Sequence, residues 1–171
     1  MRHLLILVAA CLPSGADASN SASVKELGIE VHFTQCTDAI VGDAHFCGEE
    51  VWTFDVVPDG WRSEHASIVR EVPGRWTATC RDGVYRADID GRIWPGTCRV
   101  TGDQEHLCFE TKSTTSPGDL GGELTQCFEL SGDACRMDLR GKVWQQGIAG
   151  EIVNQYDVSS RDVTVCRMLD R

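Results

Sequence analysis

Residues 106–111 read His-Leu-Cys-Phe-Glu-Thr, and residues 124–130 read Leu-Thr-Gln-Cys-Phe-Glu-Leu. The two segments resemble two β-strands, each with a cysteine followed by Phe-Glu. Between them, residues 113–122 are rich in Gly, Ser and Thr, and this composition predicts the longest loop of the chain. We therefore expect two neighbouring antiparallel strands that a Cys108–Cys127 disulfide joins across the loop.

Other strand-like segments recur along the chain about every 8–12 residues, with turn sequences such as Pro58-Asp-Gly60 between them. A strand is predicted over 28–34, and a compact, turn-rich segment with room for one helical turn over 36–48. The whole pattern predicts an all-β fold with little helix. We expect an antiparallel meander closed into a small barrel or sandwich of lipocalin-like size.

A nine-residue motif occurs twice, as Arg86–Trp94 and Arg136–Trp144. A three-residue hairpin loop with glycine in third place fits both copies, at 89–91 and 139–141. This register pairs the charged side chains with each other, sets each Arg opposite its Trp, and leaves an apolar pair on the other face; a two-residue loop would mix the faces. The motif is thus interpreted as a structural brace, built from Arg86, Asp88, Gly91, Trp94, Arg136, Asp138, Gly141 and Trp144. Two explanations of the repetition stay open. The chain contains two half-repeats, about 76–100 and 124–150, or two unrelated hairpins use the same turn sequence.

The N-terminal residues carry the features of an export signal. A basic start precedes the apolar residues 4–12, and Ala16-Asp-Ala18 offers a cleavage site, so residues 1–18 are predicted to be removed. Residues 19–27 are expected to be a flexible N-terminus, and 28–171 a single β domain. The alternative is a lipoprotein anchored through Cys11, since Val8-Ala-Ala-Cys11 resembles the bacterial lipoprotein motif. Either way the protein is expected to be periplasmic or secreted.

The remaining eight cysteines form an even set, which in an exported chain predicts a disulfide framework. Local closure favours four pairs: Cys36–Cys47, Cys80–Cys98, Cys108–Cys127 and Cys135–Cys166. A metal site near His32, Cys36, His45 and Cys47 is the competing interpretation, but the chain has no Cys-x2-Cys spacing. We therefore expect neither a metal nor another cofactor.

The net charge of −10 argues against nucleic acid or an anionic membrane as a partner and is compatible with a basic protein. We expect no transmembrane segment, and we expect the protein to be a monomer. His65 with Ser63 or Ser67 invites a hydrolase interpretation, but no Gly-x-Ser-x-Gly motif supports it, and a surface histidine is expected. The five tryptophans are expected to pack in the core and at the barrel rim rather than stack on carbohydrate.

In architecture the chain looks like the small exported β-barrels of bacteria, which include lipocalin-like proteins and periplasmic inhibitors of lysozymes or proteases. That resemblance assigns no functional residue. The leading hypothesis is a non-enzymatic exported binding protein, and its most specific version is an inhibitor of a basic secreted or cell-wall enzyme. Its binding loop would carry Ser113, Thr114, Thr115, Ser116 and Asp119. A small-ligand-binding barrel and a carbohydrate-active hydrolase remain the alternatives.

Overall fold

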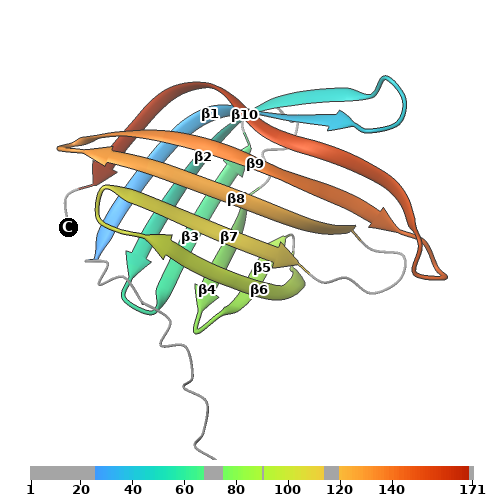
Figure 1. Cartoon of the computed structure of the whole chain (residues 1–171), viewed down its shortest axis with the longest axis horizontal. Coiled ribbons are helices and arrows are strands. Elements are labelled where there is room, and N and C mark those ends of the chain that lie inside the picture. Colours follow the sequence, from blue (N-terminus) through green and yellow to red (C-terminus); the bar gives the residue numbers. More distant parts are fainter. Residues whose placement is uncertain (1–25, 68–74, 90, 114–119, 170–171) are drawn as a thin grey trace, which may run out of the picture.

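A computed structural model describes residues 26–67, 75–89, 91–113 and 120–169. These residues form a closed antiparallel barrel in which each strand pairs with its neighbours in sequence and the first pairs with the last (Figure 1). The described part contains no helix, so the all-β prediction is confirmed. Of the two predicted architectures, barrel and sandwich, the structure has the barrel. The strands are β1 (Leu27–Ala39), β2 (His45–Val57), β3 (Gly60–Ser67), β4 (Arg75–Arg81), β5 (Val84–Ile89), β6 (Arg92–Gly102), β7 (His106–Ser113), β8 (Leu120–Ser131), β9 (Ala134–Gln146) and β10 (Ile152–Leu169).

Aromatic rings fill the middle of the barrel, because alternate side chains of each strand point inward. Phe54 is fully buried, and its ring centroid lies 5.3 Å from that of Phe109 and 5.4 Å from that of Phe128. Trp52 and Trp61 are buried in the same core, while Trp76 and Trp94 are partly buried and pack against it. The tryptophans of the core thus serve packing. Each ring contact of this kind adds roughly 0.5–1.5 kcal/mol beyond the area buried.

Four disulfides staple the barrel, and they join the same cysteines that local closure favours: Cys36–Cys47, Cys80–Cys98, Cys108–Cys127 and Cys135–Cys166. Two of them link residues that lie directly opposite each other, on β1 and β2 and on β7 and β8. The prediction of a turn-rich segment with one helical turn over 36–48 is wrong. Both strands continue through their cysteines as a regular ladder, since a cross-strand disulfide is compatible with extended backbone on both sides.

The first copy of the repeated motif forms a hairpin, but its register differs by one residue from the predicted one. Ile89 pairs with Arg92, Ala87 with Trp94 and Asp88 with Ile93, so Arg86 does not face Trp94. The loop is therefore the two-residue one that sequence patterning disfavoured. Closure of the barrel explains the difference: it turns Ala87 and Trp94 toward the core and leaves Ile93 43% exposed outside.

The second copy forms no hairpin at all, and the prediction for it is wrong. β9 runs without a turn from Ala134 to Gln146, so Arg136 and Trp144 lie on one strand, opposite Glu129 and Gly121 of β8. Gly141 is a mid-strand residue, and a Cβ there would lie 2.2 Å from the Glu123 carbonyl oxygen. Close backbone approach, rather than a turn, is what requires this glycine.

Candidate functional site

Two hairpins extend beyond the barrel at the same end, on the right of Figure 1. The first arm (residues 38–50) is the β1–β2 hairpin, and the second arm (residues 145–157) is the β9–β10 hairpin. Large apolar side chains at their tips face solvent. The exposed fractions are 45% for Ile40, 90% for Val41 and 66% for Phe46 on the first arm, and 92% for Ile148, 57% for Ile152 and 50% for Val153 on the second.

Backbone hydrogen bonds hold both arms in shape. In the first arm the Ala39 amide donates to the Ala44 carbonyl oxygen at 2.9 Å, and in the second the Gly147 amide donates to Glu151 at 2.7 Å. The arms are also joined to each other, because the Ile40 amide donates to the Gln155 carbonyl oxygen at 3.0 Å. The apolar tips are therefore presented on ordered β-structure that is anchored to the barrel.

The arms are acidic as well as apolar. Residues 38–50 and 145–157 contain no Lys or Arg, although the chain as a whole has 16. Asp38 of the first arm binds a cation from outside the arms, since Nη2 of Arg161 on β10 lies 3.4 Å from Asp38 Oδ2. Apolar tips with an acidic surround suit a partner that is basic around an apolar pocket. The arm carboxylates are Asp38, Asp43, Glu49, Glu50, Glu151 and Asp157.

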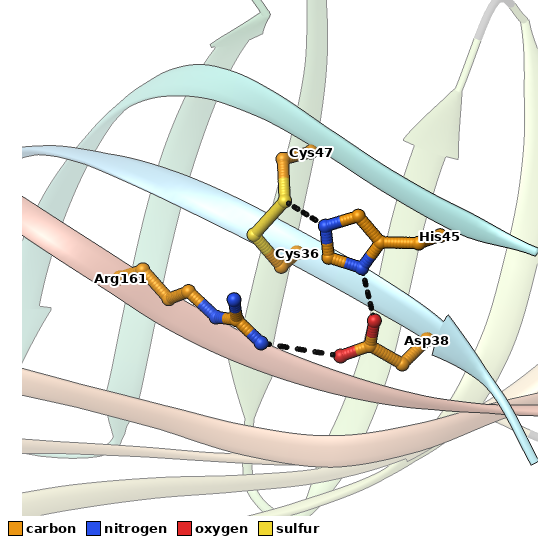
Figure 2. The surroundings of a disulfide bond; sticks show 5 residues. All are labelled: Cys36, Asp38, His45, Cys47 and Arg161. Carbon is orange, nitrogen blue, oxygen red and sulfur yellow. Dashed lines mark hydrogen bonds and ion pairs between the residues drawn. A yellow bond between two sulfur atoms is a disulfide. The ribbon is translucent and has the colours of Figure 1, made fainter.

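A cluster of functional side chains surrounds the Cys36–Cys47 disulfide within the first arm (Figure 2). His45 lies between the disulfide and a carboxylate: its Nε2 is 3.1 Å from Cys47 Sγ, and its Nδ1 contacts Asp38 Oδ1. Arg161 binds the other oxygen of Asp38. In the tautomer with its proton on Nδ1, the imidazole donates to Asp38 and turns the lone pair of Nε2 toward the sulfur.

Three of these side chains belong to the metal site that the sequence offered as the alternative to disulfide bonds. One potential ligand atom each from Cys36, His45 and Cys47 lies within 4.8 Å of the others. Thiolates bind metals, however, and the two sulfurs are bonded to each other here. The fourth suggested ligand, His32, instead contacts the Glu30 carboxylate through Nε2 at 2.9 Å.

His65 lies in the core, so the expectation of a surface histidine is wrong. Its Nε2 is 2.6 Å from the Ser63 Oγ, and its ring stacks on Trp76 with centroids 3.5 Å apart. Burial lowers the pKa of His65 well below its ordinary value. Among the described residues, Nδ1 has no hydrogen-bond partner, so the serine–histidine pair lacks an orienting carboxylate. Both side chains are at most 4% exposed, which leaves a substrate no route to the serine.

A groove of about 710 Å³ crosses the outer faces of β6 to β9. Four of its charged side chains form cross-strand pairs: Arg99 with Glu110 at 2.7 Å, and Lys112 with Glu123. Arg140 also lines the groove and binds Asp138 at 2.8 Å. Such exposed pairs each contribute roughly 0–1 kcal/mol. We interpret this groove as a solvated ladder of ion pairs on the sheet.

Of the loop residues expected to bind a partner, the structure describes only Ser113. It ends β7, and its hydroxyl donates to the Gly122 carbonyl oxygen at 3.3 Å. Thr114, Thr115, Ser116 and Asp119 lie outside the described residues.

Sequence reasoning missed both arms. The available signal was an exposed aliphatic residue beside a turn glycine, in Ile40-Val41-Gly42 and in Gly147-Ile148.

Comparison of the sequence with protein-family models, with curated proteins and with solved structures finds no match. In the described residues, no helix is long and apolar enough to cross a membrane.

Proposed function

We propose that this chain is an exported, non-enzymatic binding protein that holds a basic protein with its two arms. The observation that carries the proposal is the exposure of Val41 and Ile148, at 90% and 92%, on the tips of two hydrogen-bonded hairpins. Grouped apolar side chains on the surface of a soluble protein, unlike single scattered ones, mark interaction sites, and each arm exposes three of them. Rigid hairpins also lose little conformational entropy on binding.

The size of the partner follows from the positions of the arms. The two tips belong to separate hairpins that extend from one end of the barrel (Figure 1), so a partner that covers both must contact two hairpins at once. Packed rings such as Phe54 and Phe109 occupy the barrel interior, and an internal ligand would have to displace them. These two observations favour a protein partner over a small molecule.

The charge of the partner follows from the composition of the arms. Six carboxylates and no Lys or Arg surround the apolar tips, so a basic surface is attracted and an acidic one repelled. An inhibitor of a basic secreted or cell-wall hydrolase, such as a lysozyme, is the most specific form of this proposal. Four disulfides fit such a role, because they persist in the oxidising compartments where these enzymes act.

The test is binding and inhibition of lysozyme and other basic secreted hydrolases at low ionic strength, measured by calorimetry and by enzyme assay. The variants Val41→Asp and Ile148→Asp should each weaken binding by tenfold or more, since hot-spot residues contribute about 2 kcal/mol or more. Val84→Asp is the matched control, because Val84 is also exposed, at 63%, but lies on β5 outside the arms. Absence of binding to every basic hydrolase, or equal loss in the control, would overturn the proposal.

A further inference from the structure

The Cys36–Cys47 disulfide differs from the other three in its access to solvent. Cys47 is the only exposed residue among the eight cysteines of the described barrel, although its partner Cys36 is only 1% exposed. Of the two residues, Cys47 therefore forms the solvent-facing side of the bond, from which a thiol can approach. Thiol–disulfide exchange depends on such access and on which sulfur is attacked.

The surroundings of Cys47 supply a base at the point of attack. His45 Nε2 lies 3.1 Å from Cys47 Sγ, and Asp38 holds the opposite side of the imidazole (Figure 2). A base oriented by a carboxylate is the arrangement that activates thiol and hydroxyl nucleophiles in enzymes. Here the same arrangement faces the electrophilic sulfur, so it can take the proton from a thiol that arrives there.

We propose that Cys36–Cys47 is a thiol-exchange site, with Cys47 as the attacked sulfur, His45 as the base and Asp38 as its positioning residue. The substrate class is a dithiol, either a small molecule or a reduced Cys pair of another protein. This proposal is independent of the proposed function, because it requires no partner at the arm tips.

The reaction proceeds in two exchanges. His45 Nε2 accepts the proton of the first thiol, and the resulting thiolate attacks Cys47 Sγ. The bond between the two sulfurs breaks, and its electron pair goes to Cys36 Sγ. The proton on His45 then passes to this thiolate through one water molecule, since the ligand atoms of the two residues lie within 4.8 Å of each other. The second thiol of the dithiol then attacks the mixed disulfide, and Cys47 leaves and takes the second proton. The dithiol is oxidised by two electrons, and the disulfide of this chain is reduced.

The chain contains an internal control with the same spacing in sequence. His106-Leu-Cys108 matches His45-Phe-Cys47, and the Cys108–Cys127 disulfide also links directly opposite residues. His106 Nδ1 lies 3.8 Å from Asp103 Oδ1, and no hydrogen bond joins its ring to Cys108 in the described part of the chain. The proposal therefore requires that the two histidines differ in their effect on the neighbouring disulfide.

The experiment is partial reduction of the full chain by limiting dithiothreitol, followed by alkylation and peptide mapping. Cys36–Cys47 should open first. His45→Gln should slow its opening by roughly tenfold or more; general base catalysis usually contributes about 100-fold to 10,000-fold. Asp38→Asn should slow the opening less. Reduction of the same disulfide by a phosphine needs no base, so His45→Gln should leave that rate unchanged.

His106→Gln should leave the opening of both Cys36–Cys47 and Cys108–Cys127 unchanged with either reductant. Earlier opening of another disulfide would overturn the proposal. An equal effect of His45→Gln on dithiol and phosphine reduction would overturn it too, since that result indicates altered access rather than lost base catalysis.

Discussion

The buried serine–histidine pair makes stability depend on pH in a calculable way. His65 is 4% exposed, is packed against Trp76 and Trp52, and has a pKa that burial holds well below the ordinary value of 6.5. As the pH falls below about 6.5, the unfolded chain binds a proton at His65 that the folded chain does not bind. The stability that His65 confers is thus fully present above pH 6.5 and is lost as the pH falls toward its folded pKa.

The size of this loss follows from proton linkage. One pH unit corresponds to about 1.4 kcal/mol when a single proton separates the two states. Between pH 7 and pH 5 the free energy of unfolding should therefore fall through His65 alone by at most about 2 kcal/mol, the limit for a folded chain that binds no proton there. The range ends at pH 5 because most carboxylates titrate below it.

The perturbation that tests this is the double variant Ser63→Ala/His65→Phe. Phenylalanine retains a flat ring against Trp76, and alanine removes the hydroxyl that would lose its partner at 2.6 Å. Replacing both partners of a buried hydrogen bond by apolar groups is often close to neutral. We would measure urea unfolding at pH 7 and pH 5 with the disulfides intact. The free energy of unfolding should decrease at pH 5 in the parent chain, and the decrease in the double variant should be less than about 0.5 kcal/mol.

His106→Gln is the control and should retain the parental decrease through His65, because His106 is exposed on the barrel surface. If the double variant loses as much stability between pH 7 and pH 5 as the parent chain, the assignment of the effect to His65 is refuted.

Three further predictions concern the barrel itself. Replacing both Cys108 and Cys127 by alanine should lower the free energy of unfolding by about 3 kcal/mol in urea titrations, because the bond closes a loop of sequence separation 19. Gly121→Ala should cost about 1–3 kcal/mol in thermal unfolding, since its Cβ would lie 2.4 Å from Trp144 Nε1; Trp144→Ala in the same chain should recover part of the loss, and no recovery would contradict the contact. Burial raises the pKa of Tyr85 to about 12, so ultraviolet titration should show a late phenol ionisation that Tyr85→Phe removes.

Much of the barrel could be predicted from local sequence, because strands and turns leave local patterns. The segments around Cys108 and Cys127 form adjacent strands, as predicted, and the structure places the two cysteines directly opposite each other. Cysteines close in sequence pair with each other, which matches a meander in which sequential strands are neighbours. In such a topology, sequence proximity and spatial proximity coincide.

Two of the errors, the register of the first hairpin and the placement of His65, share one physical cause. Which face of a strand is buried depends on how the sheet closes, and the side-chain alternation alone does not specify this when both faces carry apolar residues. Ala87 and Trp94 therefore form the inward pair in place of the predicted pairing of Ala87 with Ile93. His65 is inside the barrel for the same reason, because its polar neighbours in sequence gave no sign that its face of β3 is the inner one.

The sequence alone determined the all-β class, the meander and the restriction of cysteine pairing to local partners, because period-two patterning, turn residues and short loops act between neighbours in the chain. The tertiary structure decided the inward faces of the strands, the uninterrupted course of β9 past Gly141, and the two arms at one end of the barrel. It also decided that His45, Asp38 and Arg161 meet at the Cys36–Cys47 bond. Arg161 is 123 residues from Asp38, and only closure of β10 onto β1 brings them together.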